Sequence, residues 1–378
     1  MSNFPLVSII ITNYNYDRYV RMAIESALHQ SWQNIEVIVV DDGSTDKSRE
    51  IIRKYEQKAR IILKENGGQG SAFNAGFAES KGEIILFLDA DDVLLHETVE
   101  KAVRAFTDTT ISKVHWYLWV IDEHGNTSNK ITPEKIIPHG KLIKQVIELG
   151  PNAYNSPPTS GNAWSRDFLE KVLPMPESAY TISADNYLCM LAPLYGEIQS
   201  IPEPIALYRL HGNNNFRGKY LEETLLQSKV NRFNASSSIL QDHLVKLGHK
   251  VNTENWDQNS WLKKLSRSIL DIKKFVPEKS KLILADDDQW QLADEIAGRK
   301  VVHFIEKENQ YWGPPANDDE AIKEIERQIR KRAGFIFFAW PSFWWFDYYK
   351  KMYSWLLDKH ECVIRDERLV GFKLKELV

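Results

Sequence analysis

Three short polar segments of the sequence each follow an apolar run, and each carries residue types that bind nucleotides or cations. The segments are Thr12-Asn13-Tyr14-Asn15, Asp41-Asp42-Gly43-Ser44 and Asp89-Ala90-Asp91-Asp92. An aromatic ring can stack on a base, a carboxylate can accept a hydrogen bond from its imide N–H, and paired carboxylates can bind a divalent cation. Together the segments predict a binding site for a nucleotide and a metal ion.

The alternative is that these aspartates only cap the helices that follow them, because aspartate is a favoured N-cap residue. Capping is the interpretation that we favour for Asp46, and Asp17 is also suitably placed to begin a helix. For three acidic or aromatic segments in one region, we favour the binding site.

The apolar runs before the three segments are typical of strands buried on both faces, because they are continuous and rich in β-branched residues. Strands are expected at residues 6–12, 35–40, 60–64 and 83–88, and helices at residues 20–28, 46–57 and 71–80. This alternation predicts a mostly parallel sheet with right-handed crossovers. Such sheets bind ligands at the carboxyl ends of their strands, where the three polar segments lie.

The rest of the chain predicts two further parts. Strands are expected at 113–121 and 204–210, a hairpin turn at 123–126, an irregular loop at 151–162 and a helix at 184–194. Residues 218–274 have a helical pattern, and a second α/β unit has expected strands at 281–285, 300–305 and 335–339, a helix at 318–332 and a strand pair at 362–365 and 369–374. The expected domains are residues 1–216, a helical connector at 217–276 and a smaller C-terminal α/β domain at 277–378.

Composition excludes several classes of protein. The 378 residues contain 48 Lys and Arg against 52 Asp and Glu, a net charge of −4 that gives no basic surface for nucleic acid. Two cysteines cannot form a disulfide scaffold and indicate a reducing compartment, so a cytoplasmic location is expected. No signal peptide and no membrane-spanning helix are expected.

The order of the motifs resembles glycosyltransferase family 2, whose members have the GT-A fold. The matching residues are Val7-Ser8-Ile9-Ile10-Ile11-Thr12-Asn13-Tyr14-Asn15, Val40-Asp41-Asp42-Gly43-Ser44-Thr45-Asp46, the segment 67–76, and Phe87-Leu88-Asp89-Ala90-Asp91-Asp92. Weaker matches continue to about His211. The resemblance implies a Rossmann-like GT-A domain and an inverting transfer of sugar from a nucleotide-diphospho-sugar.

The resemblance also implies roles for individual residues. The implied donor-binding residues are Thr12, Tyr14, Asp41, Asp42, Gly70, Asn74, Asp89 and Ala90. Of these, Thr12 and Tyr14 would contact the base, Asp41 or (by alignment) rather Asp42 would accept the uracil N3–H, and Asp89 would hold the ribose or the metal. Asp91 and His211 would ligate Mg²⁺ or Mn²⁺ at the diphosphate, and Asp185 would be the general base.

Two departures from the family pattern stand out. Many relatives have Ala-Arg-Asn where this chain has Ala72-Phe73-Asn74, and the usual Glu-Asp pair appears as Ala184-Asp185. An N-cap role for Asp185 is the structural alternative to general base. Arg209 is a weaker candidate for a phosphate contact, and Trp164 either stacks on a sugar or seals the core.

The function that we expect from the sequence is metal-dependent transfer from a UDP-sugar to a glycan or lipid-linked glycan in surface polysaccharide synthesis. A lipid-linked acceptor would bring the protein to the inner face of the membrane. One alternative is a non-catalytic module that binds nucleotide-sugar or glycan. Another is a haloacid-dehalogenase-like phosphatase with Asp89 as nucleophile and Asp91 as acid, because residues 84–93 also fit that pattern.

The C-terminal part is unusually aromatic, as in Trp340-Pro341-Ser342-Phe343-Trp344-Trp345. Core packing is the expected role of these rings. An acceptor-sugar platform and a membrane-interface belt are the functional alternatives.

Overall fold

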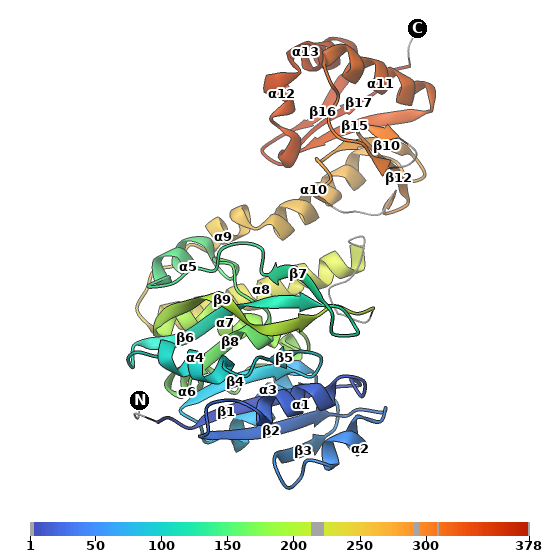
Figure 1. The fold of residues 1–378 in the computed structure, drawn as a ribbon. Coiled ribbons are helices and arrows are strands. Elements are labelled where there is room, and N and C mark those ends of the chain that lie inside the picture. Colours follow the sequence, from blue (N-terminus) through green and yellow to red (C-terminus); the bar gives the residue numbers. More distant parts are fainter. Residues whose placement is uncertain (1–3, 213–222, 291–294, 308–309, 377–378) are drawn as a thin grey trace. The chain divides into compact units, whose positions relative to one another are not determined.

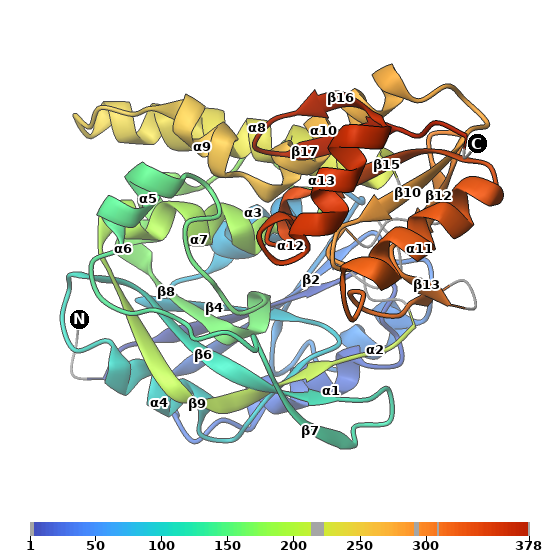
Figure 2. The same ribbon diagram turned by 90° about the horizontal axis from the view of Figure 1, so that it is seen from above.

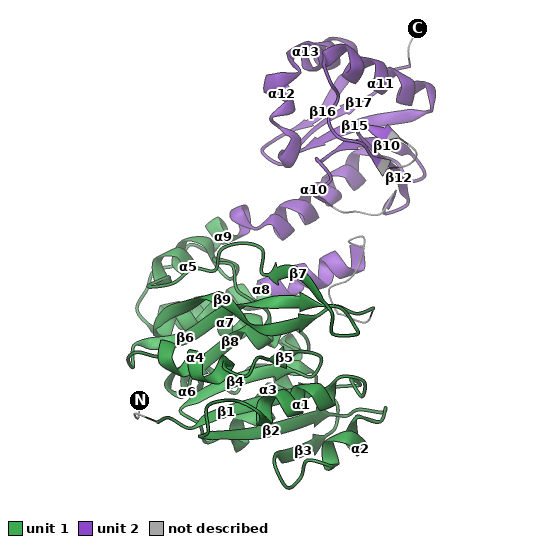
Figure 3. Cartoon of the chain, viewed as in Figure 1, with its two compact units in different colours: residues 1–215, 235–256 green, residues 216–234, 257–378 purple. Residues whose placement is uncertain are grey.

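The computed structural model describes residues 4–212, 223–290, 295–307 and 310–376 (Figure 1). The chain divides into two compact units: residues 1–215 with 235–256, and residues 216–234 with 257–378 (Figure 3). The first crossing between the units lies outside the described residues, as does the expected domain boundary at residue 216. The residues of the expected connector are shared between the units, and the three-part division stays an interpretation of the sequence.

Unit 1 is built on a curled, mixed sheet whose amino-terminal half is parallel. The order of its strands is β3-β2-β1-β4-β8-β6-β9-β5, and β7 pairs with β6. Strands β1, β2, β3 and β4 run parallel, whereas β8 is antiparallel to both β4 and β6. The bounds are β1 Val7–Asn13, β2 Ile35–Asp42, β3 Arg60–Lys64, β4 Ile84–Asp89, β5 Val93–Leu94, β6 Ile111–Ile121, β7 Thr127–Thr132, β8 Asn162–Ser165 and β9 Glu197–Arg209.

Helices cover both faces of this sheet. Figure 2 shows α1, α2 and α4 on one face and α3, α6 and α7 on the other. The bounds are α1 Val20–Leu28, α2 Ser48–Arg53, α3 Gln69–Glu79, α4 Thr98–Ala105, α5 Ile143–Leu149, α6 Arg166–Val172 and α7 Ala184–Tyr195, and the helices α8 Glu223–Lys246 and α9 Thr253–Asn259 are each divided between the two units. Covered faces explain why these strands are apolar throughout and do not alternate.

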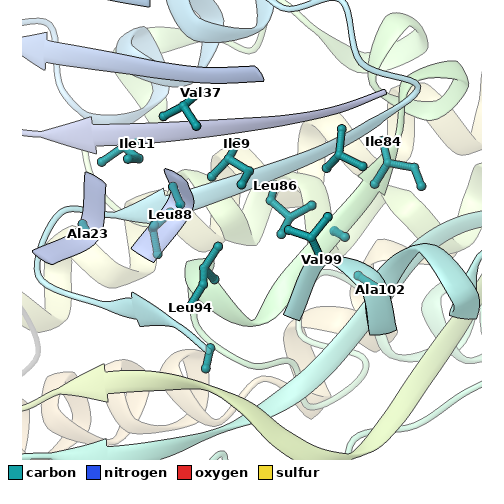
Figure 4. Close-up of a cluster of buried hydrophobic side chains, with 14 of the residues drawn as sticks. Ile9, Ile11, Ala23, Val37, Ile84, Leu86, Leu88, Leu94, Val99 and Ala102 are labelled. Atoms are coloured by element: carbon teal, nitrogen blue, oxygen red, sulfur yellow. The ribbon is translucent and has the colours of Figure 1, made fainter. Parts of the chain in front are cut away.

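The core beneath α1 and α4 is formed by every second residue of the central strands. Ile9 and Ile11 of β1 pack with Leu86 and Leu88 of β4 and with Val99 of α4, all less than 2% exposed (Figure 4). Side chains at positions i and i+2 of a strand share a face, so the intervening residues point to the opposite helices. The observed register pairs Ile9 of β1 with Leu86 of β4 and so determines where the strand ends lie relative to one another.

Unit 2 is a second α/β layer structure. Its six-stranded sheet has the order β11-β12-β10-β15-β17-β16, in which β10 is parallel to β12 and β15, and β16 and β17 form an antiparallel pair. The bounds are α10 Trp261–Phe275, β10 Lys281–Ala285, β11 Glu295–Ile296, β12 Arg299–His303, β13 Glu306–Lys307, β14 Gln310–Tyr311, α11 Asp318–Arg330, β15 Ala333–Ala339, α12 Trp345–Tyr348, α13 Lys350–Lys359, β16 Glu361–Arg365 and β17 Leu369–Lys373. The predicted α/β class is therefore confirmed for both units.

The aromatic residues of unit 2 divide between core and surface. Trp345 and Tyr349 are at most 2% exposed and belong to a buried cluster, which confirms core packing for these two rings. Trp344 and Tyr348 remain 44% and 64% exposed. The indole N–H groups of both Trp344 and Trp345 donate to the Asp287 carboxylate. Neither functional alternative for the exposed rings is tested by this arrangement.

Some local expectations from the sequence are wrong. Asp17 does not cap α1, because the helix begins after Tyr19 and the Asp17 carboxylate instead accepts from the backbone N–H of Lys47. The helix expected at 46–57 is shorter, Ser48–Arg53, although Asp46 does accept from the N–H of Ser48 at its start. Strand β2 continues through Asp42, so Asp41 and Asp42 are the last two residues of the strand and do not follow it.

No helix among the described residues is both long and apolar enough to cross a bilayer.

Helix α3 approaches the sheet closely at Gly76. A Cβ built on Gly76 would lie 2.3 Å from Cγ2 of Ile10. Gly76→Ala should therefore lower the free energy of unfolding by about 1–3 kcal/mol, because overpacking outweighs the helix propensity gained. Gly212→Ala, where a Cβ meets nothing within 4 Å, is the control. Urea denaturation of both variants checks this; equal midpoints would contradict the packing argument.

Candidate active site

The parallel register brings the three polar strand ends to one edge of the sheet. Asn13 of β1 pairs with Asp41 of β2, and Thr12 pairs with Asp89 of β4. The sequence prediction that these segments meet is thus confirmed. Thr12 is 9% exposed and Tyr14 is 47% exposed, so the Tyr14 ring is open to stack on a planar ligand.

Asp41 is fully buried, and its carboxylate accepts hydrogen bonds from other residues of the chain. Its carboxylate accepts from the Asn13 amide at 2.9 Å, the Ser44 N–H at 3.0 Å and the Arg49 Nε at 2.7 Å. Burial alone would raise the pKa of Asp41, but the hydrogen bonds from Ser44, Arg49 and Asn13 outweigh it and lower the pKa below its usual range. Asp41 therefore joins the ends of β1 and β2 as a carboxylate.

Asp42 organises the loop that leads into α3. Its carboxylate accepts from the Lys64 Nζ at 2.6 Å, the Gly67 N–H at 3.0 Å and the Gly68 N–H at 2.7 Å. Gly68 has φ +85°, and a Cβ there would lie 2.6 Å from Cα of Thr181, so this position requires glycine. Each aspartate of the pair thus has one long basic side chain among its partners, Arg49 at Asp41 and Lys64 at Asp42.

A pocket of about 510 Å³ lies next to the aspartate pair at the ends of β2 and β3. It is lined by Gly43, Ser44, Thr45, Arg49, Leu63, Lys64, Glu65 and Asn66. Neither Asp42 nor Tyr14 is among the lining residues, so the pocket borders the predicted base-binding residues and does not contain them.

Carboxylates crowd the end of β4. Burial raises the pKa of Asp89 to about 8, and the negative charges of Asp91 and Asp185 add to the effect. Burial also raises the pKa of Asp92 well above its usual range, with contributions from Asp91 and Asp89. Like charges in a region of low dielectric disfavour ionisation, so this edge favours a bound cation or neutral carboxyl groups.

Asp91 and His211 are brought together across 120 residues. The Nε2 atom of His211 lies 3.0 Å from Oδ2 of Asp91, and the side chains are only 4% and 10% exposed. The His211 ring stacks on Tyr19 at 5.1 Å and meets the edge of Tyr16 at 5.6 Å. A divalent cation can be coordinated by a carboxylate oxygen and an imidazole nitrogen.

Among the described residues, no three acidic, cysteine or histidine side chains are grouped so as to hold a metal ion. Asp91 and His211 together fit a cation that takes its remaining ligands from a bound substrate. The fit rests on the chemistry of these two donors and on their proximity.

Arg209 has a structural role that the sequence did not indicate. It is 1% exposed, its Nε donates to the Asp91 carbonyl at 2.9 Å, and its guanidinium lies 4.8 Å above the Tyr19 ring. Its backbone N–H donates to the Asp92 carboxylate at 2.9 Å. The structure thus uses Arg209 to hold the loop of Asp91 and Asp92.

Asp185 lies in the first turn of α7 and is half-buried. The N-cap of this helix is Ser183, so the alternative of Asp185 as N-cap is wrong. The charge of Asp185 raises the pKa of Asp89, which places both carboxylates in one electrostatic environment. Its position next to the crowded edge suits a group that interacts with an acceptor.

The other residues of the α3 motif are used for packing. The Asn74 side chain donates to the Met175 carbonyl at 3.0 Å and accepts from the Met175 N–H at 2.9 Å. Phe73, which replaces the arginine of many relatives, is fully buried and stacks on Phe87 at 3.9 Å. Gly70 and Ala90 are buried, and a Cβ on Gly70 would lie 2.9 Å from the Tyr180 carbonyl oxygen. Donor contacts of Asn74, Gly70 and Ala90 stay predictions.

The sequence did not predict the role of Gln69, and it left two alternatives for Trp164. Gln69 lies between Asp89 and α7 and contacts both, but a glutamine inside a glycine-rich segment carries no signal of such a role. Trp164 is 1% exposed and packs against Phe168, so it seals the core and has no face free for a sugar.

A curled, mostly parallel sheet with acidic strand ends and a facing helix-borne carboxylate defines the GT-A class of glycosyltransferase domain. Residues 8–159 match the model of glycosyl transferase family 2. An uncharacterized glycosyltransferase of Nostoc sp. is 35% identical over 253 residues, which are 66% of this chain and 78% of that protein. The chain therefore belongs to glycosyltransferase family 2, and the resemblance found in the sequence is confirmed.

Other similar proteins agree with this assignment. An uncharacterized glycosyltransferase of Rickettsia felis is 40% identical over 149 residues, 38% of this chain but only 25% of that longer protein. The crystal structure of S. aureus TarS 1-349 aligns with a TM-score of 0.50 at 19% identity, covering 72% of this chain and 76% of that one, which supports the fold. Family membership makes the phosphatase alternative wrong.

Removal of the Asp41 charge should destabilise the protein in a pH-dependent way. Because the folded pKa of Asp41 is lowered, its contribution to stability is present above the unfolded pKa of about 4 and is lost as pH falls through the folded pKa. Asp41→Asn should cost about 1–3 kcal/mol at pH 7, and the difference from wild type should shrink below about pH 4.

Denaturant titrations at pH 7 and pH 3.5 measure this difference. The exposed Asp167→Asn variant is the control, with an expected change of less than about 0.5 kcal/mol. A pH-independent difference for Asp41→Asn would contradict the assignment of a low pKa.

Proposed function

We propose that this chain is a metal-dependent, inverting glycosyltransferase that uses a nucleotide-diphospho-sugar, and specifically a UDP-sugar, as donor. The observation that carries the proposal is the pair formed by Asp91 and His211, 3.0 Å apart, at the edge where Asp89 pairs in register with Thr12. Family membership supports sugar transfer in general, and these residues support a cation and a diphosphate at this edge.

The base of the donor would lie at the ends of β1 and β2. Tyr14 is exposed there and would stack on the uracil ring. Between the two aspartates, we favour Asp42 as acceptor of the uracil N3–H, as the alignment with the family implies; each has a partner on a flexible stem, Lys64 at Asp42 and Arg49 at Asp41. Asp41 is held by Asn13 and by the backbone of its own turn. Asp89 would then face the ribose.

Asp91 and His211 would hold the divalent cation, Mg²⁺ or Mn²⁺. When bound, such a cation neutralises negative charge on the departing diphosphate. The crowding of Asp89, Asp91 and Asp92 supports this assignment, because a cation would offset both the burial and the repulsion that raise the pKa of Asp89 and Asp92.

Asp185 would act as general base on the acceptor side. Its carboxylate takes the proton of the acceptor hydroxyl while the oxygen forms a bond to the anomeric carbon and the bond from that carbon to the diphosphate breaks. The nucleoside diphosphate leaves from the opposite face, so the configuration inverts. The half-buried position of Asp185 in the first turn of α7 supports this role.

The acceptor class that we propose is a growing glycan or a lipid-linked glycan in surface polysaccharide synthesis, and this rests on the family. The two cysteines, Cys189 and Cys362, are unpaired, which supports a cytoplasmic setting. Peripheral contact with the inner face of the membrane would follow from a lipid-linked acceptor.

Asp91→Ala should abolish metal-dependent donor binding, because one of two protein ligands of the cation is removed. Calorimetric titration of UDP with and without Mn²⁺ measures this. Wild type should bind UDP only with Mn²⁺, and the variant should lose at least tenfold in affinity. UDP binding that does not depend on metal in either protein would overturn the metal assignment.

Asp185→Asn should keep UDP and Mn²⁺ affinity within about threefold and lower turnover by about 100-fold or more, the contribution typical of general bases. Release of UDP from UDP-glucose, UDP-galactose or UDP-N-acetylglucosamine, whichever wild type consumes, measures turnover. Asp185→Asn with near wild-type turnover would remove Asp185 from the mechanism. A wild type that binds UDP but consumes no donor with any acceptor would favour the non-catalytic alternative.

A further inference from the structure

Gln69 connects the two sides of the proposed site with a single side chain. It is the first residue of α3, and its Nε2 donates to Oδ1 of Asp89 at 3.2 Å and to the hydroxyl of Thr159 at 3.3 Å. Its Oε1 accepts from the N–H of Ala184 at 2.9 Å. Asp89 belongs to the donor edge, and Ala184 directly precedes Asp185.

On the side of α7, the Gln69 side chain caps the first turn of the helix in place of the N-cap residue. Within the part of the chain that the structure describes, Ser183 at the N-cap supplies no side-chain cap and has a left-handed backbone with φ 59°. The first amides of a helix need external acceptors, and Gln69 supplies one from another element. Backbone bonds from Gln69 to Thr181 and from Gly70 to Tyr180, both 2.9 Å, fix the same approach.

On the side of β4, Gln69 donates to a carboxyl group that is crowded by other acids. A carboxamide is suited to this position because it offers one acceptor to the helix amide and two donor hydrogens to oxygen atoms. A glutamate would keep only the acceptor, and a methionine would keep neither.

We propose that Gln69 is a positioning residue that locks the first turn of α7, and hence Asp185, to the donor-side carboxylate Asp89. This deepens the proposed function, on which it rests. Gln69 sets the alignment of the general base with the anomeric carbon and takes no part in binding the nucleotide. Small displacements of reacting groups are costly, since catalysis depends on orientation.

The test uses Gln69→Met, which keeps the length of the side chain and removes all three hydrogen bonds. The full chain is assayed for UDP affinity with Mn²⁺ by calorimetry and for turnover by UDP release from the donor that wild type consumes. The expected result is a 10- to 100-fold lower kcat with UDP affinity within threefold of wild type. Gln69→Glu retains the acceptor for Ala184 but places a further carboxyl group beside Asp89, so it should lower kcat at least tenfold and also lower Tm.

Gln30 offers a matched control in the same unit. Its Nε2 donates to the Leu95 carbonyl at 2.9 Å and its Oε1 accepts from the Val99 N–H at 3.0 Å, so it also bridges segments. Gln30→Met should lower Tm but leave kcat per folded molecule within twofold of wild type. That contrast separates positioning from general destabilisation.

The outcomes distinguish this inference from the function on which it rests. If wild type turns over, Asp185→Asn is inactive, and both Gln69 variants keep kcat within twofold of wild type, the positioning role is wrong and the proposed function stands. A parallel loss of kcat in Gln30→Met would also overturn it. Wild type that neither binds UDP nor consumes a donor would instead overturn the proposed function.

Discussion

The burial of several carboxylates at one edge of the sheet is the constraint on which the candidate site depends, because desolvation and mutual repulsion both disfavour their charges. Asp89, Asp91 and Asp92 follow one another at the end of β4, and Asp185 adds its charge from α7. The surrounding chain holds this edge with groups that donate to it: Arg209 binds the backbone of Asp91 and the carboxylate of Asp92. Bulky apolar strands behind the edge exclude water and strengthen each of these interactions.

The two acidic motifs show how surroundings decide what an aspartate does. Asp41 is as buried as Asp92, yet its pKa is lowered and that of Asp92 is raised. Burial favours a higher pKa at both groups, but at Asp41 the hydrogen bonds from Ser44, Arg49 and Asn13 outweigh it, whereas at Asp92 the charges of other carboxylates add to it. The motif of Asp41 therefore joins strands, whereas the motif of Asp92 leaves negative charge that a ligand can balance.

The strands of the amino-terminal half and the meeting of their ends were predictable because they depend on short-range patterns, whereas the order of the strands and the short strand β8 were not predicted. Continuous apolar runs such as residues 84–88 of β4 need cover on both faces, and a parallel sheet gathers their carboxyl ends. Helix ends were less predictable. Asp17 fits the capping preference, but its backbone N–H donates to the Asp46 carboxylate and its own carboxylate accepts from the Lys47 N–H. The helix begins only after Tyr19.

The sequence by itself determined the family, the α/β class and the acidic edge, since residue types at fixed spacing carry these. Only the tertiary structure decided which side chains meet across long separations. Gln69 reaches Ala184 over 115 residues, which no pattern predicted, whereas the approach of His211 to Asp91 over 120 residues had been expected from the family resemblance alone. Trp164 was ambiguous until its burial was known. Such contacts depend on the packing of helices and loops, and a local pattern of hydrophobicity does not encode that packing.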